Sequence, residues 1–323
     1  MKRGRRSRAG MPSGPVGIVE WNPSTVTEPV YADMDDGDYF WYNPLGVGLR
    51  NAFHHLPTQY SIPTVGGNKR FRVSVHPDST GLYNYRAEVT RDWESGMPLG
   101  TRDALAWGLE IPSGGLKNHD EDIDFFQWHS GSAPGYSSNS PCMYGVISRA
   151  GTEDDNDDVA QLNEIVVVSS IRNFEQEANP QISGRINTGV VVANGERHEF
   201  YMELKSGINL TGSFVLWHCK QTSPGVFTAW TKIYENLAES TAWANDADRG
   251  SNSNVHPDWK VGIYCPGVRD LSGVLGEEAL NGGTPGSYSI TYDIPGIRNL
   301  YLPANHAFYN APTLLGYLQT TDM

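Results

Sequence analysis

Residues 69–76 of this 323-residue chain read Lys-Arg-Phe-Arg-Val-Ser-Val-His. Within this stretch the apolar side chains of Phe71, Val73 and Val75 alternate with polar ones. Because successive side chains of a β-strand point to opposite faces, the alternation predicts a strand with one buried and one solvated face. The similar segment 83–91 follows a turn that contains Pro, Asp and Gly. Together the two segments predict a β-hairpin with a longer loop.

The same strand signals recur along most of the chain, whereas helix signals are rare. The further predicted strands cover residues 104–111, 122–129, 143–148, 164–171, 185–192, 196–205, 212–220, 227–234, 259–264 and 288–293. Short strands separated by turns, in a chain with 35 Gly and 20 Pro, predict an all-β sandwich of two antiparallel sheets. We expect short helices at 235–248 and 313–320, and a single domain over residues 16–323 after a flexible basic tail at residues 1–15.

The charge and composition of the chain argue against several classes of protein. A formal net charge of −13 opposes general nucleic-acid binding, because such binding depends on the neutralisation of phosphates. Three cysteines indicate neither a disulfide framework nor a zinc site of paired cysteines. No run of about 18 apolar residues occurs, and the basic N-terminus leads into Gly, Pro and Ser rather than an apolar region. We therefore expect no membrane association and no Sec signal peptide.

Three of the predicted strands carry side chains suited to ligand binding or acid–base chemistry. In the first, Arg86, Glu88 and Thr90 share one face. The Glu88 carboxylate would hold the Arg86 guanidinium in place to bind an acidic ligand. A cross-strand ladder of exposed charges is the alternative. In the second, Gln127 and His129 share a face, which pairs an amide donor with a proton acceptor. A structural histidine is the alternative there.

The third strand, 260–264, reads Lys-Val-Gly-Ile-Tyr and places Lys260, Gly262 and Tyr264 on one face. Lys and Tyr act as acid or base once their surroundings shift their pKa values, and Gly allows a substrate to approach the backbone closely. Tyr is also common in strands, so this pair by itself indicates little. The functional hypothesis depends on all three segments occurring in one β protein.

Taken in order, Arg-x-Glu-Val at 86–89, Gln-x-His at 127–129 and Lys-x-Gly-x-Tyr at 260–264 resemble the signature of the jelly-roll polysaccharide lyases, which include alginate, glucuronan and heparin lyases. The resemblance spans about residues 70–265, and its specificity lies in the order and spacing of the motifs. It implies a concanavalin A-like jelly-roll fold with few short helices. It also implies cleavage of a uronic-acid-containing polysaccharide by β-elimination, with no cofactor required.

The resemblance also implies roles for individual residues. The implied catalytic residues are Tyr264, His129, Gln127, Arg86 and Lys260, and the implied substrate-binding residues are Glu88, Arg91 and Trp259. Gln127 and Arg86 would neutralise the uronate carboxylate and stabilise the enolate-like intermediate. His129 or Tyr264 would remove the C5 proton, and Tyr264 would return a proton to the leaving oxygen. Lys260 would lower the pKa of the phenol or bind an acid group of the substrate.

Two positions depart from the lyase pattern. In the alginate lyase motif a second Arg follows the first by four residues, whereas Arg91 follows Arg86 by five and is expected to face away. Cys265 and Pro266 stand where many relatives continue with polar residues. The first departure weakens the expectation of a second carboxylate clamp, and the second indicates that the strand ends there.

An acidic run in the middle of the chain is a weak candidate for calcium binding. Glu153, Asp155, Asp157 and Glu164 fall at positions 1, 3, 5 and 12 of a calcium loop, but Asp158 stands where that loop needs Gly. A solvated acidic loop is the alternative interpretation. Calcium is therefore a minor option, at a place distant from the proposed catalytic residues.

Two other classes of function stay open. Laminarinase-like hydrolases carry Glu-x-Asp-x-x-Glu, and the nearest segment here, 122–127, ends in an amide instead of the acid. A non-catalytic carbohydrate-binding or virion-surface jelly roll is the other alternative. The expected partner is an anionic polysaccharide, with virion association open. We expect the protein to act outside the cell or on a virion, because that substrate class lies there.

Overall fold

The computed structural model describes residues 18–27, 39–44, 48–51, 60–75, 86–91, 97–98, 100, 102–117, 122–130, 141–149, 158–169, 184–207, 210–239, 241, 254–255, 257–265 and 289–302. Within these ranges the regular structure consists of β-strands, and helices are absent. Accordingly, the described part of the chain has no helix long and apolar enough to cross a membrane.

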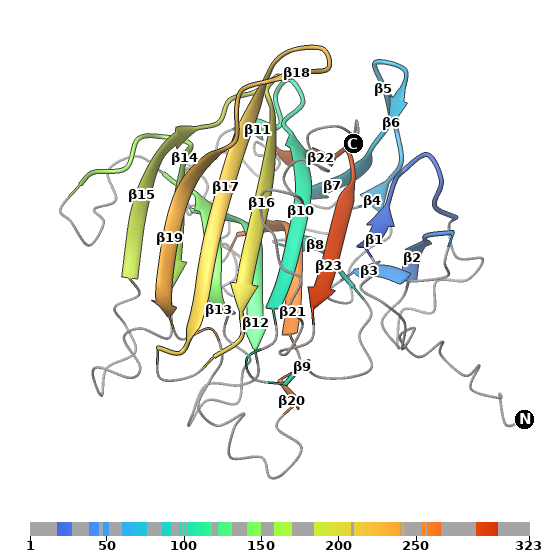
Figure 1. Ribbon diagram of the computed structural model, residues 1–323. Helices are drawn as coiled ribbons and strands as arrows, with labels where there is room; N and C mark the ends of the chain where they lie inside the picture. The colour runs from blue at the N-terminus through green and yellow to red at the C-terminus, as the bar shows by residue number, and fades with distance from the viewer. Residues whose placement is uncertain are drawn as a thin grey trace, which may run out of the picture.

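Most strands belong to two antiparallel sheets (Figure 1). Sheet A follows the order β18 (Val226–Phe227), β17 (Gly212–Ser223), β16 (Arg197–Lys205), β10 (Arg102–Glu110), β22 (Ser289–Ile294), β7 (Phe71–Val75) and β4 (Tyr60–Ser61). In the same sheet, β1 (Ile18–Trp21) pairs with β23 (Ile297–Leu302), which also pairs with β10. Strand β11 (Leu116–Lys117) pairs with β22, and β19 (Thr231–Glu239) pairs with β17.

Sheet B has eight strands within the described residues. Its order is β15 (Gly184–Val191), β14 (Glu164–Ser169), β13 (Pro141–Ile147), β12 (Ile123–Ser130), β21 (Pro257–Tyr264), β8 (Arg86–Arg91), β3 (Gly48–Asn51) and β2 (Tyr39–Tyr42). Two short ribbons pair β20 (Asn254–Val255) with β9 (Met97–Pro98) and β5 (Thr64–Val65) with β6 (Asn68–Lys69). Figure 1 shows the sheets as stacked layers, with β16 and β17 in front of β12 and β13.

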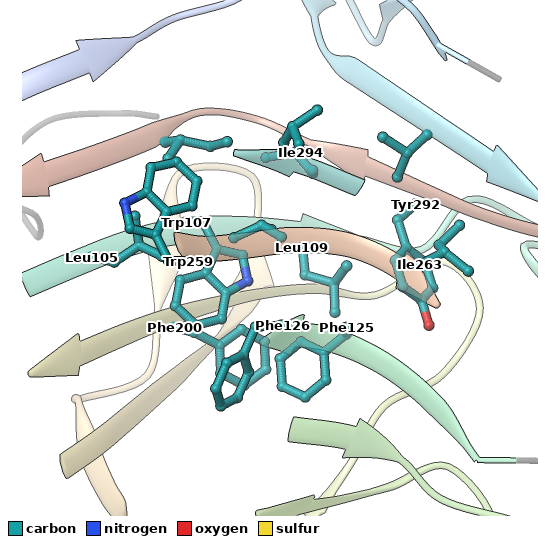
Figure 2. Close-up of a cluster of buried hydrophobic side chains, with 14 of the residues drawn as sticks. Leu105, Trp107, Leu109, Phe125, Phe126, Phe200, Trp259, Ile263, Tyr292 and Ile294 are labelled. Carbon is teal, nitrogen blue, oxygen red and sulfur yellow. The ribbon is translucent and has the colours of Figure 1, made fainter. Parts of the chain in front are cut away.

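Aromatic side chains from both sheets fill the space between the layers (Figure 2). Trp107 of sheet A lies 5.5 Å from Phe126 and 6.2 Å from Phe125 of sheet B, measured between ring centroids. Trp21 and Trp259 meet edge-on at 6.0 Å, again across the layers. Each fully buried large side chain contributes about 1.5–3 kcal/mol through removal from water, so this cluster is the main source of cohesion.

A β-bulge in β12 places two consecutive phenylalanines in this core. The register of β12 shifts between Asp124 and Phe126 against both neighbouring strands, and Phe125 and Phe126 are both buried. Gly145 on the adjacent β13 makes room for them, because a Cβ there would lie 2.2 Å from the Phe126 ring. The normal alternation of faces is therefore broken at this point of β12.

The prediction of an all-β, concanavalin A-like jelly-roll sandwich is confirmed, but two local predictions are wrong. Strand β7 pairs with β22 and β4 in sheet A, whereas β8 pairs with β21 and β3 in sheet B, so segments 69–76 and 83–91 form no hairpin. Residues 235–239 belong to β19 rather than a helix, because hydrogen bonds to β17 decide their conformation. The other predicted helix, 313–320, and the tail 1–15 lie outside the described residues.

Candidate functional site

Strand order in sheet B brings the three chemically interesting segments side by side. Strand β21 lies between β12 and β8, and Lys260 is the cross-strand neighbour of both Gln127 and Thr90. Four residues along β21, Tyr264 pairs with Arg86 on one side and with Asp124 on the other. Segments that are about 40 to 170 residues apart in sequence therefore form one continuous patch.

The patch lies on the face of sheet B that points away from sheet A. Val261 and Ile263 of β21 belong to the core cluster, so the alternating positions 260, 262 and 264 are on the outer face. Gln127 and Lys260 nevertheless expose only 1% and 4% of their surface, whereas Tyr264 is partly exposed. An amide and an ammonium are thus held in a sheltered environment beside a phenol that solvent reaches.

Hydrogen bonds fix several members of this patch. The Thr90 hydroxyl donates to the Trp259 carbonyl at 2.6 Å, and the Tyr60 hydroxyl donates to the Glu88 carbonyl at 3.1 Å. The Gln127 amide nitrogen donates to the Asp124 carboxylate at 2.7 Å. Asp124 is itself 3% exposed, and the interpretation of the sequence did not assign it to this site.

Gly262 is required by the neighbouring strand rather than by a ligand. Its φ angle of +146° is unfavourable for other residues, and a Cβ would lie 2.2 Å from the Ala87 carbonyl oxygen. The close approach that this glycine allows is therefore the approach of β8.

The remaining predicted site residues lie in different environments. Trp259 is 1% exposed and packs on Trp21 in the core, so its assignment to substrate binding is corrected. The reason is alternation, because Trp259 precedes Lys260 on β21 and points to the opposite face. Glu88 is buried and pairs with Gly262. The backbone of Arg91 pairs with Leu49, and that of His129 pairs with Asp258.

The described residues do not bring the predicted calcium ligands together in one site. Glu153, Asp155 and Asp157 lie outside them. Glu164 is buried at the start of β14, where its carboxylate accepts the backbone N–H groups of Gly189 at 2.7 Å and Gln161 at 2.9 Å. In the part of the chain that the structure describes, no group of three or more His, Cys, Asp or Glu side chains is placed to hold a metal ion.

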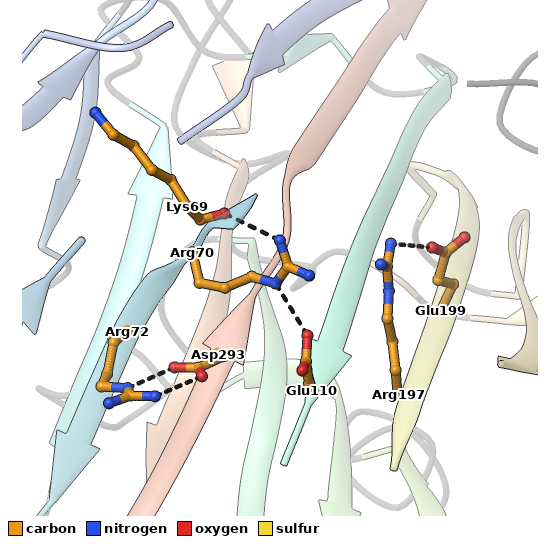
Figure 3. A network of polar contacts seen from close by, with 7 residues as sticks. All are labelled: Lys69, Arg70, Arg72, Glu110, Arg197, Glu199 and Asp293. Carbon is orange, nitrogen blue, oxygen red and sulfur yellow. Dashed lines mark hydrogen bonds and ion pairs between the residues drawn. The ribbon is translucent and has the colours of Figure 1, made fainter. Parts of the chain in front are cut away.

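The outer face of sheet A carries ion pairs that largely neutralise one another (Figure 3). Arg72 binds Asp293 through two hydrogen bonds of 2.6 and 2.7 Å, and these bonds raise the pKa of the guanidinium. Arg70 pairs with Glu110 at 2.9 Å, in the same way as Arg197 pairs with Glu199. The three arginines on this face are therefore already paired with carboxylates.

Sequence reasoning missed a histidine pair at one end of the core. His198 on β16 and His218 on β17 lie with their Nδ1 and Nε2 atoms 2.9 Å apart. The second ring nitrogen of His198 lies 3.1 Å from the Glu196 carboxylate, which also binds the ammonium of Lys220. On both strands apolar residues alternate with polar ones, and this alternation indicates that His198 and His218 face the core.

Burial decides the protonation of this pair. Removal from water lowers the pKa of His198 to about 4, although the hydrogen bond and charge of Glu196 act in the opposite direction. Removal from water, together with the neighbouring His198, lowers the pKa of His218 to about 3. Because the Glu196 carboxylate accepts only, neutral His198 carries its proton on Nε2, and its Nδ1 accepts from His218.

An antiparallel jelly-roll sandwich with a polar patch on one outer face is a fold shared by enzymes and by binding proteins. No family model matches the sequence, and no curated protein matches it. The solved structures to which the chain is similar are mostly polysaccharide lyases.

Three of these structures illustrate the likeness. An endo-β-1,4-glucuronan lyase from Trichoderma reesei is 16% identical, with a TM-score of 0.48 over 76% of this chain and 86% of that one. A variant alginate lyase in complex with an alginate trisaccharide is 12% identical, with a TM-score of 0.42 over 88% and 97%. An endo-1,3-β-glucanase from Streptomyces sioyaensis is 11% identical, with a TM-score of 0.41 over 88% and 89%. Likeness at this level leaves the activity to be argued from the residues of the site.

Proposed function

We propose that the outer face of β12, β21 and β8 is the active site of a polysaccharide lyase that cleaves a uronic-acid-containing polysaccharide by β-elimination. The observation that carries the proposal is the register. It puts Gln127 directly beside Lys260 and places the partly exposed Tyr264 farther along the same face. These are the group types that bind a carboxylate and move a proton.

The first requirement of β-elimination is a neutralised uronate carboxylate, because the C5 proton is barely acidic while that group keeps its full charge. The Gln127 amide and the Lys260 ammonium are cross-strand neighbours whose Cβ atoms lie about 5 Å apart in a sheet. Both groups donate hydrogen bonds, and both are sheltered from water, where such donors stabilise developing negative charge most strongly. We assign them together to the carboxylate.

The second requirement is proton transfer at C5 and at the leaving oxygen. Four residues of strand, roughly 13 Å, separate Lys260 from Tyr264. That separation favours Lys260 as a carboxylate-binding group rather than as the group that tunes the phenol. Tyr264 then removes the C5 proton and protonates the leaving oxygen, because His129 pairs with Asp258, six residues along β21 from Tyr264, too far to act on the same sugar residue.

The local charge is compatible with an anionic polymer despite the net charge of −13. The outer face of β12, β21, β8 and β3 carries three basic residues, Lys260, Arg86 and Arg50, and three acidic ones, Asp124, Glu88 and Asp258. Arg50 is the cross-strand neighbour of Thr90, which extends the row of Gln127 and Lys260 to a fourth strand. The patch is therefore close to neutral, in contrast to the chain as a whole, and this lowers the repulsion of an anionic polymer.

Two other functions compete with this proposal. For a hydrolase of the laminarinase type, Asp122 would have to act on the sugar, yet its carboxylate binds Arg185 and the backbone N–H of Arg149, at 2.9 and 3.0 Å. Gln127 stands at the position of the missing acid. A purely binding protein is the other alternative, and the appearance of product distinguishes it from a lyase.

The test is incubation with alginate, glucuronan, heparin, hyaluronan and pectate, with ultraviolet absorbance of the new C4–C5 double bond as readout. Activity that is lost in Tyr264→Phe and retained in Tyr234→Phe, a matched change on sheet A, supports the proposal. New reducing ends without absorbance would instead indicate hydrolysis. Binding of a polymer without any product would indicate a binding protein, and either outcome overturns the lyase assignment.

A further inference from the structure

Asp124 belongs to the outer-face patch because of the bulge in β12. An alternating strand would place Asp124 and Gln127, three positions apart, on opposite faces. The register shift after Asp124 and the burial of both Phe125 and Phe126 absorb one residue into the core. As a result Asp124 is the cross-strand neighbour of Tyr264, while Gln127 is the neighbour of Lys260.

The contact between the two side chains fixes the orientation of the Gln127 amide. The Gln127 nitrogen lies 2.7 Å from Oδ2 of Asp124, and both residues are almost completely buried. A carboxylate only accepts hydrogen bonds, so the amide nitrogen, and not its oxygen, must face Asp124. A hydrogen bond to a charged acceptor is short and strong, and it holds the flexible glutamine side chain in one rotamer.

We propose that Asp124 is a positioning residue that holds the Gln127 amide in the orientation needed to neutralise the substrate carboxylate. The inference rests on the lyase function proposed above and deepens it. Asp124 does not itself take part in proton transfer, and its effect on the reaction passes through Gln127. A misplacement of about 1 Å at such a group costs roughly 100-fold in rate, so the contact matters for turnover.

The experiment compares Asp124→Ala with Asp124→Asn on the polymer that the wild-type protein cleaves fastest. We expect Asp124→Ala to lower kcat roughly 10- to 100-fold with a smaller change in KM. Asp124→Asn keeps an oxygen that accepts the Gln127 N–H, so kcat and its pH profile should stay close to wild type. Asp122→Asn, just before β12, is the matched control, because the Asp122 carboxylate pairs with Arg185 instead. Its kcat should be unchanged.

A double-mutant cycle distinguishes positioning from a general structural effect. If Asp124 acts through Gln127, then Asp124→Ala should cause no further loss of kcat in a Gln127→Ala background. A loss in that background of the same size as in wild type overturns the proposal. So does an Asp124→Ala protein with wild-type kcat, or an Asp124→Asn protein that is as inactive as Asp124→Ala, since the charge itself would then be needed.

Different results refute the lyase function and the positioning role of Asp124. Absence of activity in the wild-type protein on every polymer removes the lyase function and this role of Asp124 with it. Activity in wild type with no effect at Asp124 removes the positioning role alone. If Asp124→Ala does not fold, Asp124→Asn and its pH profile decide the matter, because a shifted or abolished profile contradicts a role through hydrogen bonding.

Discussion

The buried histidine pair should make the stability of this protein depend on pH in a way that a single substitution isolates. His218 is neutral in the folded state, with a pKa lowered to about 3, whereas an unfolded histidine titrates near 6.5. Between these values the unfolded chain binds a proton that the folded chain cannot accept. The stability associated with neutral His218 is therefore fully present above pH 6.5 and is lost progressively as the pH falls below it.

The magnitude follows from the two pKa values. At pH 5, protonation of a histidine with a pKa of 6.5 stabilises the unfolded chain by about 2 kcal/mol. At pH 7.5 this stabilisation of the unfolded chain is negligible. His218→Gln removes the titration but keeps an N–H group able to donate to His198 Nδ1. The wild-type free energy of unfolding should therefore fall, relative to this variant, by about 2 kcal/mol between pH 7.5 and pH 5.

The assay is equilibrium unfolding in urea at constant ionic strength, at half-unit steps from pH 5 to pH 7.5, followed by tryptophan fluorescence. Carboxylates and the histidines outside this pair titrate equally in both proteins, so the difference between them reports the loss of His218 from its contact with His198. The m-values of the two proteins should agree, which shows that the same surface unfolds. A difference in unfolding free energy that stays constant across this range would refute the argument that His218 is neutral and buried.

Three further predictions concern packing and charge. Gly262→Ala should cost about 1–3 kcal/mol of unfolding free energy, because its Cβ would collide with the Ala87 carbonyl; a thermal or urea midpoint equal to wild type would contradict this. Asp293→Asn should cost about 1–3 kcal/mol, since the fully buried Asp293 carboxylate makes both charged hydrogen bonds to Arg72. The exposed control Glu235→Gln should cost less than about 1 kcal/mol in the same urea titration, and equal costs for the two variants would argue against burial as the cause. For the polymer substrate, KM should rise severalfold between ~0.05 M and ~0.5 M salt with little change in kcat, and a KM indifferent to salt would contradict an electrostatic contribution to binding.

Alternation along the chain was sufficient to predict most strands and the face on which their side chains lie. Segment 260–264 places Lys260 and Tyr264 opposite Val261 and Ile263 whatever the partner strands are, because the period of two is a property of the extended backbone. The same rule, applied to position 259, would have placed Trp259 in the core. Its assignment to the substrate followed the lyase resemblance rather than the alternation.

The tertiary structure alone decided which strands adjoin and where alternation fails. Segments 69–76 and 83–91 are close in sequence and resemble a hairpin, yet β7 and β8 belong to opposite sheets. Pairing between distant strands depends on the packing of the whole core, which no local pattern contains. The contact between Asp124 and Gln127 depends in turn on a bulge that accommodates two phenylalanines opposite Gly145. Sequence by itself therefore determined the strands and their polar faces, whereas long-range packing determined the neighbours that make one of those faces a candidate active site.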